Sequence, residues 1–220
     1  MKETHRGIPT ITNKKNERKA KTIINRLGQK SMSLPRIDDK KRFAGFMGLA
    51  GISRKTAKLV PSDCKVFVEC FAGSGKITQE LMKLTNKIEK FVLNDKSAFV
   101  YEWLKREMPN AIVTQEDFVD CILKWDGPDT VFLIDDPWFM SFYKQSFTTF
   151  DRPSVKAYNE EIIAYCELFM QGRFIITSRK ENRVYLKSKF YHKLVKSEYV
   201  VCGKYPKVLL TTNIDFRKKQ

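Results

Sequence analysis

A glycine-rich segment has the residue types of a nucleoside-binding loop. Residues 69–76 read ECFAGSGK and lie between an apolar run at 65–69 and an amphipathic stretch at 77–84. Glycines between a strand and a helix let the backbone approach a ligand closely, beside the free N–H groups of the helix N-terminus. Asp95 ends the next apolar run, where a carboxylate can accept hydrogen bonds from ribose hydroxyls. We therefore predict a nucleoside site formed by this loop and Asp95.

Two other glycine motifs fit this segment poorly. A phosphate-binding loop requires Gly-x-x-x-x-Gly-Lys-Ser/Thr, but Cys70 occupies the first glycine position and Ile77 replaces the hydroxyl that would hold magnesium. A full dinucleotide fingerprint requires a third glycine, and residues 79–81 contain none. The sequence thus favours a nucleoside ligand over a bound triphosphate.

A second segment, 135–138, reads DDPW and directly follows four apolar residues at 131–134. A polar turn at the carboxyl end of a buried strand lies where open α/β sheets bind ligands. Asp135 and a neighbouring carbonyl can accept hydrogen bonds from an exocyclic amine, and Trp138 or Phe139 can stack on a base. Such contacts aim the amine lone pair at a methyl donor, so that positioning does most of the catalysis.

The elements that must position these residues alternate between short apolar runs and amphipathic stretches. This pattern predicts an α/β fold, with a mostly parallel sheet covered by helices on both faces and an antiparallel hairpin at the C-terminal end. The predicted strands are 65–69, 91–93, 111–113, 131–134, 174–177, 199–201 and 208–211. The predicted helices are 52–59, 77–84, 98–106, 118–125, 155–169 and 184–190.

The charge of the chain is typical of a protein that binds a polyanion. The 220 residues carry a formal net charge of +16 and the pI is about 9.6. Residues 1–60 hold 16 Lys and Arg against 4 Asp and Glu. We predict a basic, flexible arm at 1–40 and a catalytic domain at 41–220; the arm either contacts nucleic-acid phosphates or only aids solubility.

Several classes of protein are disfavoured. No run approaches the length of a membrane-spanning helix, and the polar N-terminus lacks a signal region, so we expect an intracellular protein without membrane contact. The five cysteines are far apart and odd in number, which predicts reduced, mostly buried thiols rather than disulfides or zinc ligands. With two histidines besides, we expect no metal site.

These motifs together resemble a known family. The loop at 69–75, Asp95, the turn at 116–118 and the box at 135–138 are similar to those of class I S-adenosylmethionine-dependent methyltransferases that make N6-methyladenine. Their box is Asp/Asn/Ser-Pro-Pro-Tyr/Phe/Trp. The order resembles the DNA adenine methylase group, in which a glycine-rich segment ending in lysine, here 48–55, precedes the cofactor loop. The resemblance covers roughly residues 42–213 and implies a Rossmann-like methyltransferase fold.

The resemblance also implies roles for individual residues. The expected ligands of S-adenosylmethionine are Lys55, Glu69, Phe71, Ala72, Gly73, Ser74, Gly75, Asp95, Asp117 and Phe118. The expected catalytic residues are Asp135, Asp136, Pro137 and Trp138. The aromatic loop after the box either packs in the core or forms a lid over a splayed-out base, with Phe139, Phe142, Tyr143 and Lys144 as expected substrate contacts.

Two departures from the family bear on activity and specificity. Asp136 stands where the family has its first proline, which puts catalysis in doubt; the register 136–139 is an alternative in which Trp138 replaces the second proline. Only about 17 residues separate Phe118 from Asp135, too few for a module that reads a DNA sequence in the major groove. Target specificity must then come from the basic arm, the 139–153 loop or a protein partner, and RNA or a single-stranded substrate becomes plausible.

Three alternatives to an adenine-N6 methyltransferase acting on DNA or RNA remain open. The first is a catalytically weak or inactive methyltransferase-like subunit that binds nucleic acid. The second is a methyltransferase acting on protein or a small molecule. The third is a nucleoside triphosphatase, for which the paired acids at 135–136 could hold magnesium although the phosphate loop is broken.

Overall fold

A computed structural model describes residues 51–135, 166, 170–179, 190–196 and 207–216 of the protein. The helices run over α2 (Ile52–Ala57), α3 (Lys76–Leu84), α4 (Ala98–Glu107) and α5 (Phe118–Trp125). The strands run over β1 (Val66–Cys70), β2 (Lys90–Asn94), β3 (Ile112–Thr114), β4 (Thr130–Ile134), β5 (Arg173–Arg179), β6 (Tyr191–Lys196) and β7 (Lys207–Thr212).

The strands form one seven-stranded sheet in the order β3-β2-β1-β4-β5-β7-β6. Strands β1 to β5 pair in parallel, while β7 is inserted antiparallel between β5 and β6. The order reverses between β1 and β4, and the carboxyl ends of strands at such a switch point are where open α/β sheets bind ligands. The fold is thus the predicted Rossmann-like arrangement with an antiparallel C-terminal hairpin.

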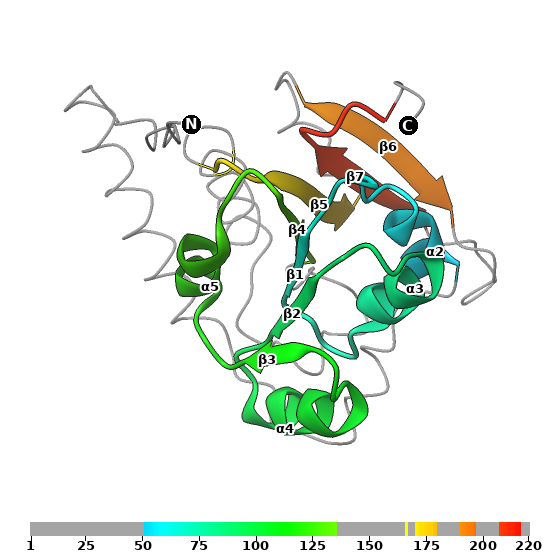
Figure 1. Ribbon diagram of the computed structural model, residues 1–220. Helices are drawn as coiled ribbons and strands as arrows, with labels where there is room; N and C mark the ends of the chain where they lie inside the picture. The colour runs from blue at the N-terminus through cyan, green and yellow to red at the C-terminus, as the bar shows by residue number, and fades with distance from the viewer. Residues whose placement is uncertain (1–50, 136–165, 167–169, 180–189, 197–206, 217–220) are drawn as a thin grey trace, which may run out of the picture.

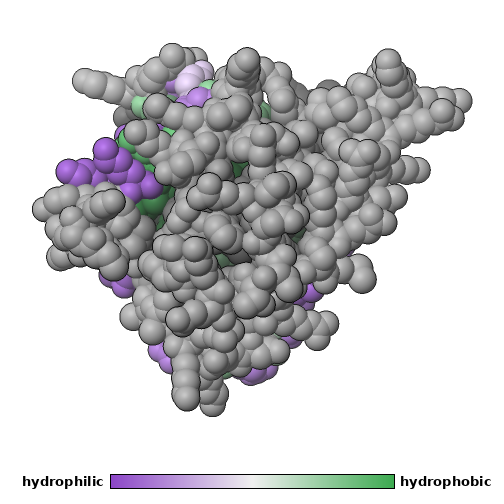
Figure 2. Space-filling model, turned by 180° about the vertical axis from the view of Figure 1, so that it is seen from behind, coloured by the Kyte–Doolittle hydropathy of each residue, from purple (hydrophilic) through white to green (hydrophobic). Residues whose placement is uncertain are grey.

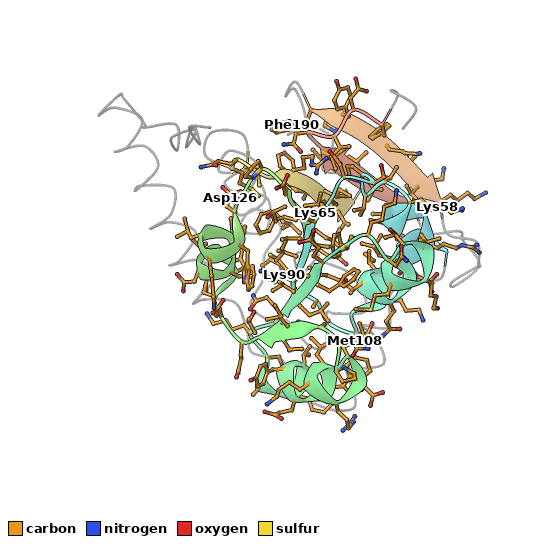
Figure 3. All side chains as sticks on the ribbon, viewed as in Figure 1. Lys58, Lys65, Lys90, Met108, Asp126 and Phe190 are labelled. Atoms are coloured by element: carbon orange, nitrogen blue, oxygen red, sulfur yellow. The ribbon has the colours of Figure 1, made fainter. Side chains whose placement is uncertain are left out.

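The sheet is covered on both faces, as the apolar runs of its central strands require. Helices α2 and α3 lie on one side and α5 on the other (Figure 1). Alternate residues of each strand enter separate cores: Phe132 packs with α5, whereas Val131 and Leu133 pack with α2 and α3. A smaller cluster joins α4 to β2 through Leu93 and Leu104. The side chains that fill these layers are drawn in Figure 3, where Lys65 and Lys90 mark the N-terminal ends of β1 and β2.

Polar contacts fix the N-terminal ends of β4 and β5, opposite the carboxyl ends of the strands where ligands are expected. Asp126, labelled in Figure 3, follows α5 and accepts hydrogen bonds from the main-chain N–H groups of Gln171 and Gly172 at 2.9 and 2.8 Å. A Cβ at Gly172 would lie 3.0 Å from the carbonyl oxygen of Gly127 and 3.1 Å from that of Thr130, so the main chain around it would have to move to admit a side chain. These contacts fix where β5 begins beside β4.

The sequence placed most described elements correctly, with one correction. The range 118–125 was predicted for α5 and is observed, and the other described helices and the strands β1 to β5 and β7 differ by two residues or fewer at either end. The hairpin, however, pairs β7 with Tyr191–Lys196, for which no strand was predicted. This edge strand alternates only weakly between polar and apolar residues, so its pattern is faint. The predicted strand 199–201, the helices 155–169 and 184–190 and the arm 1–40 fall on residues that, except for Cys166 in a helix and Phe190, lie outside the described set.

Four of the five cysteines can be placed. Cys64, Cys70, Cys121 and Cys166 are buried and form no disulfide in the described part of the chain, and their burial agrees with the expectation for these four. Within the described ranges, no helix has the length and apolar character needed to cross a membrane. Seen from behind, the described residues that reach the surface are mainly hydrophilic, with a small hydrophobic area beside them (Figure 2).

Candidate cofactor and substrate site

The glycine loop makes a tight turn between β1 and α3. Phe71, Gly73 and Gly75 all have left-handed backbones, with φ of 58°, 50° and 62°. The Gly75 N–H donates to the Ala72 carbonyl at 2.7 Å and closes the turn. A Cβ on Gly75 would lie 3.2 Å from Leu104 Cδ2 in addition to the left-handed strain. The loop therefore favours glycine at this position, and it leads directly into the first turn of α3.

Asp95, directly after β2, joins the glycine loop to the neighbouring turn. Its Oδ2 accepts a hydrogen bond from the Gly73 N–H at 3.0 Å, and its Oδ1 accepts one from the Ser97 N–H at 3.0 Å. Burial raises the pKa of this carboxyl, against the lowering effect of the two backbone hydrogen bonds. A carboxylate has about four acceptor sites, so Asp95 keeps the capacity to accept from ribose hydroxyls.

Glu69, at the end of β1, supports the loop from beneath. It is 3% exposed, and its Oε2 accepts hydrogen bonds from the Thr78 N–H at 3.1 Å and from the Thr78 hydroxyl. Burial raises the pKa of Glu69 to about 8; the hydrogen bonds from Thr78 oppose this shift and the nearby charge of Asp135 adds to it. Glu69 thus caps α3 within the chain, and its predicted contact with a cofactor stays a prediction. Thr78, which completes this contact, carried no motif signal in the sequence.

Asn94 fixes the turn expected to hold the adenine. Its side chain is 2% exposed and donates to the Glu116 carbonyl at 3.1 Å. Its Oδ1 accepts from the Glu116 N–H at 2.9 Å and from the Thr114 hydroxyl at 2.8 Å. These three bonds hold the turn 114–117 against the end of β2, next to Asp95. Sequence reasoning missed Asn94; its place at the end of a buried strand was the available signal.

Asp117 ends this turn and Phe118 begins α5, and both side chains make contacts within the chain. Asp117 caps α5 by accepting from the Val119 N–H at 3.1 Å, and it forms an ion pair with Lys96 at 3.2 Å. The Phe118 ring is 3% exposed and contacts the Phe71 ring, with 5.1 Å between centroids. The structure therefore brings the glycine loop, Asp95 and this turn together, while their contacts with adenine stay predictions.

Asp135 continues β4 at the same edge of the sheet. Its Oδ1 accepts a hydrogen bond from the Thr177 hydroxyl on β5. Burial raises the pKa of Asp135 to about 6, although the bond from Thr177 lowers it. The other residues of the predicted box and lid lie outside the described residues, namely Asp136, Pro137, Trp138, Phe139, Phe142, Tyr143 and Lys144.

Lys55, the remaining predicted cofactor residue, contacts the far side of the sheet. Its Nζ donates to the Lys196 carbonyl on β6 at 3.0 Å. Strands β4, β5 and β7 separate β6 from β1, so this contact lies roughly 19 Å along the sheet from the strand that leads into the glycine loop. The structure thus does not bring Lys55 to the loop, and its role stays a prediction. Within the described ranges, no group of three or more His, Cys, Asp or Glu side chains could hold a metal ion.

Comparison with known proteins gives only distant structural likenesses. No protein-family model and no curated protein matches the chain. Among solved structures, it is similar to a putative methyltransferase, yhhF, from Escherichia coli, with 18% identity, a TM-score of 0.45 and coverage of 81% of this chain and 90% of that one. It is also similar to the B. subtilis M1A22 tRNA methyltransferase TrmK, with 14% identity, a TM-score of 0.49 and coverage of 75% and 66%.

A third likeness is to M. jannaschii TYW2 in complex with AdoMet, with 16% identity, a TM-score of 0.44 and coverage of 73% and 74%. At these identities and TM-scores, the likenesses carry no argument about the activity of this chain. The fold assignment therefore rests on the observed strand order, and the function has to be argued from the site itself.

Proposed function

We propose that the chain is an S-adenosylmethionine-dependent methyltransferase that acts on the N6 amine of adenine in nucleic acid. One observation carries the cofactor assignment: main-chain N–H groups that could bind a phosphate already donate hydrogen bonds to carboxyl groups. The Gly73 N–H donates to Asp95, and the Thr78 N–H in the first turn of α3 donates to Glu69. A triphosphate placed there would meet carboxyl groups instead of free amides. A nucleoside with a cationic sulfonium and no phosphate suits this electrostatic environment.

The residues present fit such a cofactor in two further respects. Asp95 retains acceptor capacity for ribose hydroxyls. The left-handed Gly73 carries no side chain that would keep a ligand from the loop. When bound, the cofactor supplies an electrophilic methyl group. The chain holds the ribose with Asp95 and presents Asp135 beside the same edge of the sheet.

Asp135 supports the amine assignment. In its ionised form it accepts a hydrogen bond from an exocyclic amine, which orients the nitrogen lone pair. The predicted partners in this task are Asp136, Pro137 and Trp138, with an aromatic ring stacked on the base. The net charge of +16 supports a polyanionic substrate. We favour DNA because of the order of the motifs. RNA is the alternative, because the residues between Phe118 and Asp135 are too few for a module that reads the DNA groove.

A second candidate is a weakly active or inactive methyltransferase-like subunit that binds nucleic acid. The observation that favours it is Asp136 in place of the first proline, which removes rigidity from the box and adds a charge. In either case a protein partner could supply the target specificity.

One experiment separates the two candidates. The protein is incubated with S-adenosylmethionine carrying a labelled methyl group and with separate DNA and RNA pools, and the nucleosides are then analysed. Labelled N6-methyladenosine, deoxy or ribo, supports the enzyme and identifies its substrate class; labelled methylcytosine contradicts the assignment. Cofactor binding without transfer to any pool supports the inactive subunit. Calorimetry that shows binding of ATP but no binding of S-adenosylmethionine would refute both candidates.

Paired variants test the box. Asp135→Ala and Asp136→Ala should differ sharply in methyl transfer while both bind the cofactor as the wild type does. We expect Asp135→Ala to lose transfer because Asp135 directly follows the buried strand β4 and alanine offers the amine no acceptor. Loss of transfer with Asp136→Ala alone would instead support the register 136–139, in which Asp136 accepts the hydrogen bond from the amine.

A further inference from the structure

Three polar side chains lie near the carboxyl ends of three neighbouring strands, on the side of the sheet that faces α2 and α3. They are Glu69 on β1, Asp135 after β4 and Thr177 on β5. Ile134 pairs with Ile176, so Asp135 and Thr177 are the next residues in register. Thr177 is 2% exposed, and its hydroxyl donates to Asp135 Oδ1. Within the described residues, this is the hydrogen bond that the Asp135 side chain makes.

The hydrogen-bond partner of Thr177 differs from those of two other buried threonines in the sheet. The hydroxyl of Thr130 donates to the Trp125 carbonyl at 2.9 Å, and that of Thr212 donates to the Phe174 carbonyl. Those bonds satisfy a buried hydroxyl with the main chain. Thr177 instead donates to a carboxylate that is a candidate for substrate contact.

We propose that Thr177 is a positioning residue for Asp135, an inference that rests on the proposed function. The hydroxyl holds Oδ1 and leaves Oδ2 to accept the hydrogen bond from the target amine. Support from β5 makes the carboxylate part of the rigid sheet rather than of the loop that follows β4. A carboxylate free to rotate would present the amine in many orientations, and transfer is sensitive to such misplacement.

Thr177 also affects the charge of Asp135. Glu69 is the described titratable group whose charge interacts with that of Asp135. Burial raises the pKa of Asp135 to about 6, and the hydroxyl of Thr177 opposes that rise by stabilising the ionised form. Without the hydroxyl, a larger share of Asp135 is protonated at neutral pH. When the proton lies on Oδ2, that oxygen donates and no longer accepts the hydrogen bond from the amine.

The test compares Thr177→Val, which keeps the shape and removes the hydroxyl, with Thr177→Ser, which keeps the hydroxyl. Thr130→Val is the matched control at the other end of β4. Carboxyl carbon NMR, assigned with Asp135→Asn, follows the titration of Asp135, and methyl transfer is measured against pH. For Thr177→Val we expect the pKa of Asp135 and the acid limb of kcat to move up by about one pH unit. We also expect kcat to fall about tenfold or more at neutral pH. Thr177→Ser and Thr130→Val should resemble the wild type.

The outcomes separate this inference from the proposed function. If Thr177→Val leaves both the titration and the rate profile unchanged, the inference is overturned while methyl transfer stands. If the wild type transfers no methyl group, the proposed function fails, and the NMR titration still decides whether Thr177 controls the charge of Asp135. Should Thr177→Val not fold, Thr177→Ala against Thr177→Ser gives the same comparison, and equal titrations in these two would overturn the inference.

Discussion

Replacing Glu69 by glutamine should change how the stability of the protein depends on pH. Glu69 is 3% exposed and its pKa in the folded chain is raised to about 8, from an ordinary value of 4.5. Between these two values the unfolded chain loses the proton and the folded chain keeps it. Folded-state stability from this group is therefore greatest at low pH and falls as pH rises through the window. Glutamine resembles the protonated acid and can still accept the hydrogen bonds from Thr78.

The magnitude follows from the width of that window. Each pH unit in which the two states differ by one proton changes the free energy of unfolding by about 1.4 kcal/mol. Across pH 4.5 to 8 the wild type should lose roughly 3 to 5 kcal/mol relative to Glu69→Gln, an upper estimate because local relaxation lowers the cost of burying a charge. The difference between the two proteins cancels the contribution of every other titrating group that the variant leaves unchanged.

Urea unfolding at pH 5, 6, 7 and 8 measures this difference. The stability of Glu69→Gln should rise steadily relative to the wild type as pH increases. Glu80→Gln is the control, because Lys83 lowers the pKa of Glu80. The pH dependence of stability from Glu80 therefore has the opposite sign: the stabilisation is present above the ordinary pKa and is lost on acidification. Parallel pH curves for Glu69→Gln and the wild type would refute the reasoning and show that Glu69 is ionised in the folded protein.

Three further variants test the architecture of the site. Gly75→Ala combines left-handed strain with a contact 3.2 Å from Leu104, so it should lower the free energy of unfolding by about 1 to 3 kcal/mol in urea; Gly127→Ala, where a Cβ meets only Thr130 at 3.7 Å, should change it little. Asn94→Ala removes three hydrogen bonds and should cost about 2 to 4 kcal/mol in the same assay, and an unchanged midpoint would contradict its role. Asp95→Ala should weaken S-adenosylmethionine binding at least about tenfold by calorimetry; equal affinity would remove it from the ribose site.

The fold was largely predictable because its signals are local. Short, fully apolar runs such as 131–134 are typical of buried strands, and the apolar stripe on 118–125 is typical of an amphipathic helix packed against them. β6 was missed because an edge strand needs only one buried face, and of its residues Val195 alone is fully buried. The pairing of β6 with β7, rather than of 199–201 with β7, depends on contacts distant in sequence.

The candidate site was predicted in its loops and missed in its supports. The glycine loop, Asp95 and Asp117 were found because glycine spacing and strand-end acids are visible in a sequence. Asn94 and Thr177 were not found, because a polar residue inside an apolar run shows its purpose only when its partner is known. Their partners are Glu116, 22 residues away, and Asp135, 42 residues away.

Asp135 and Glu69, the two buried carboxyl groups on the α3 side of the sheet, influence each other's ionisation. The pKa is about 6 for Asp135 and about 8 for Glu69, and the charge of Asp135 contributes to the higher value. Because the pKa of Asp135 is the lower of the two, Asp135 ionises before Glu69 as pH rises. If Glu69 ionised first, its charge would raise the pKa of Asp135 and protonate the group proposed to receive the amine. Keeping Glu69 neutral beneath the glycine loop thus leaves Asp135 able to accept a hydrogen bond, which links the stability of the loop to the chemistry proposed for the end of β4.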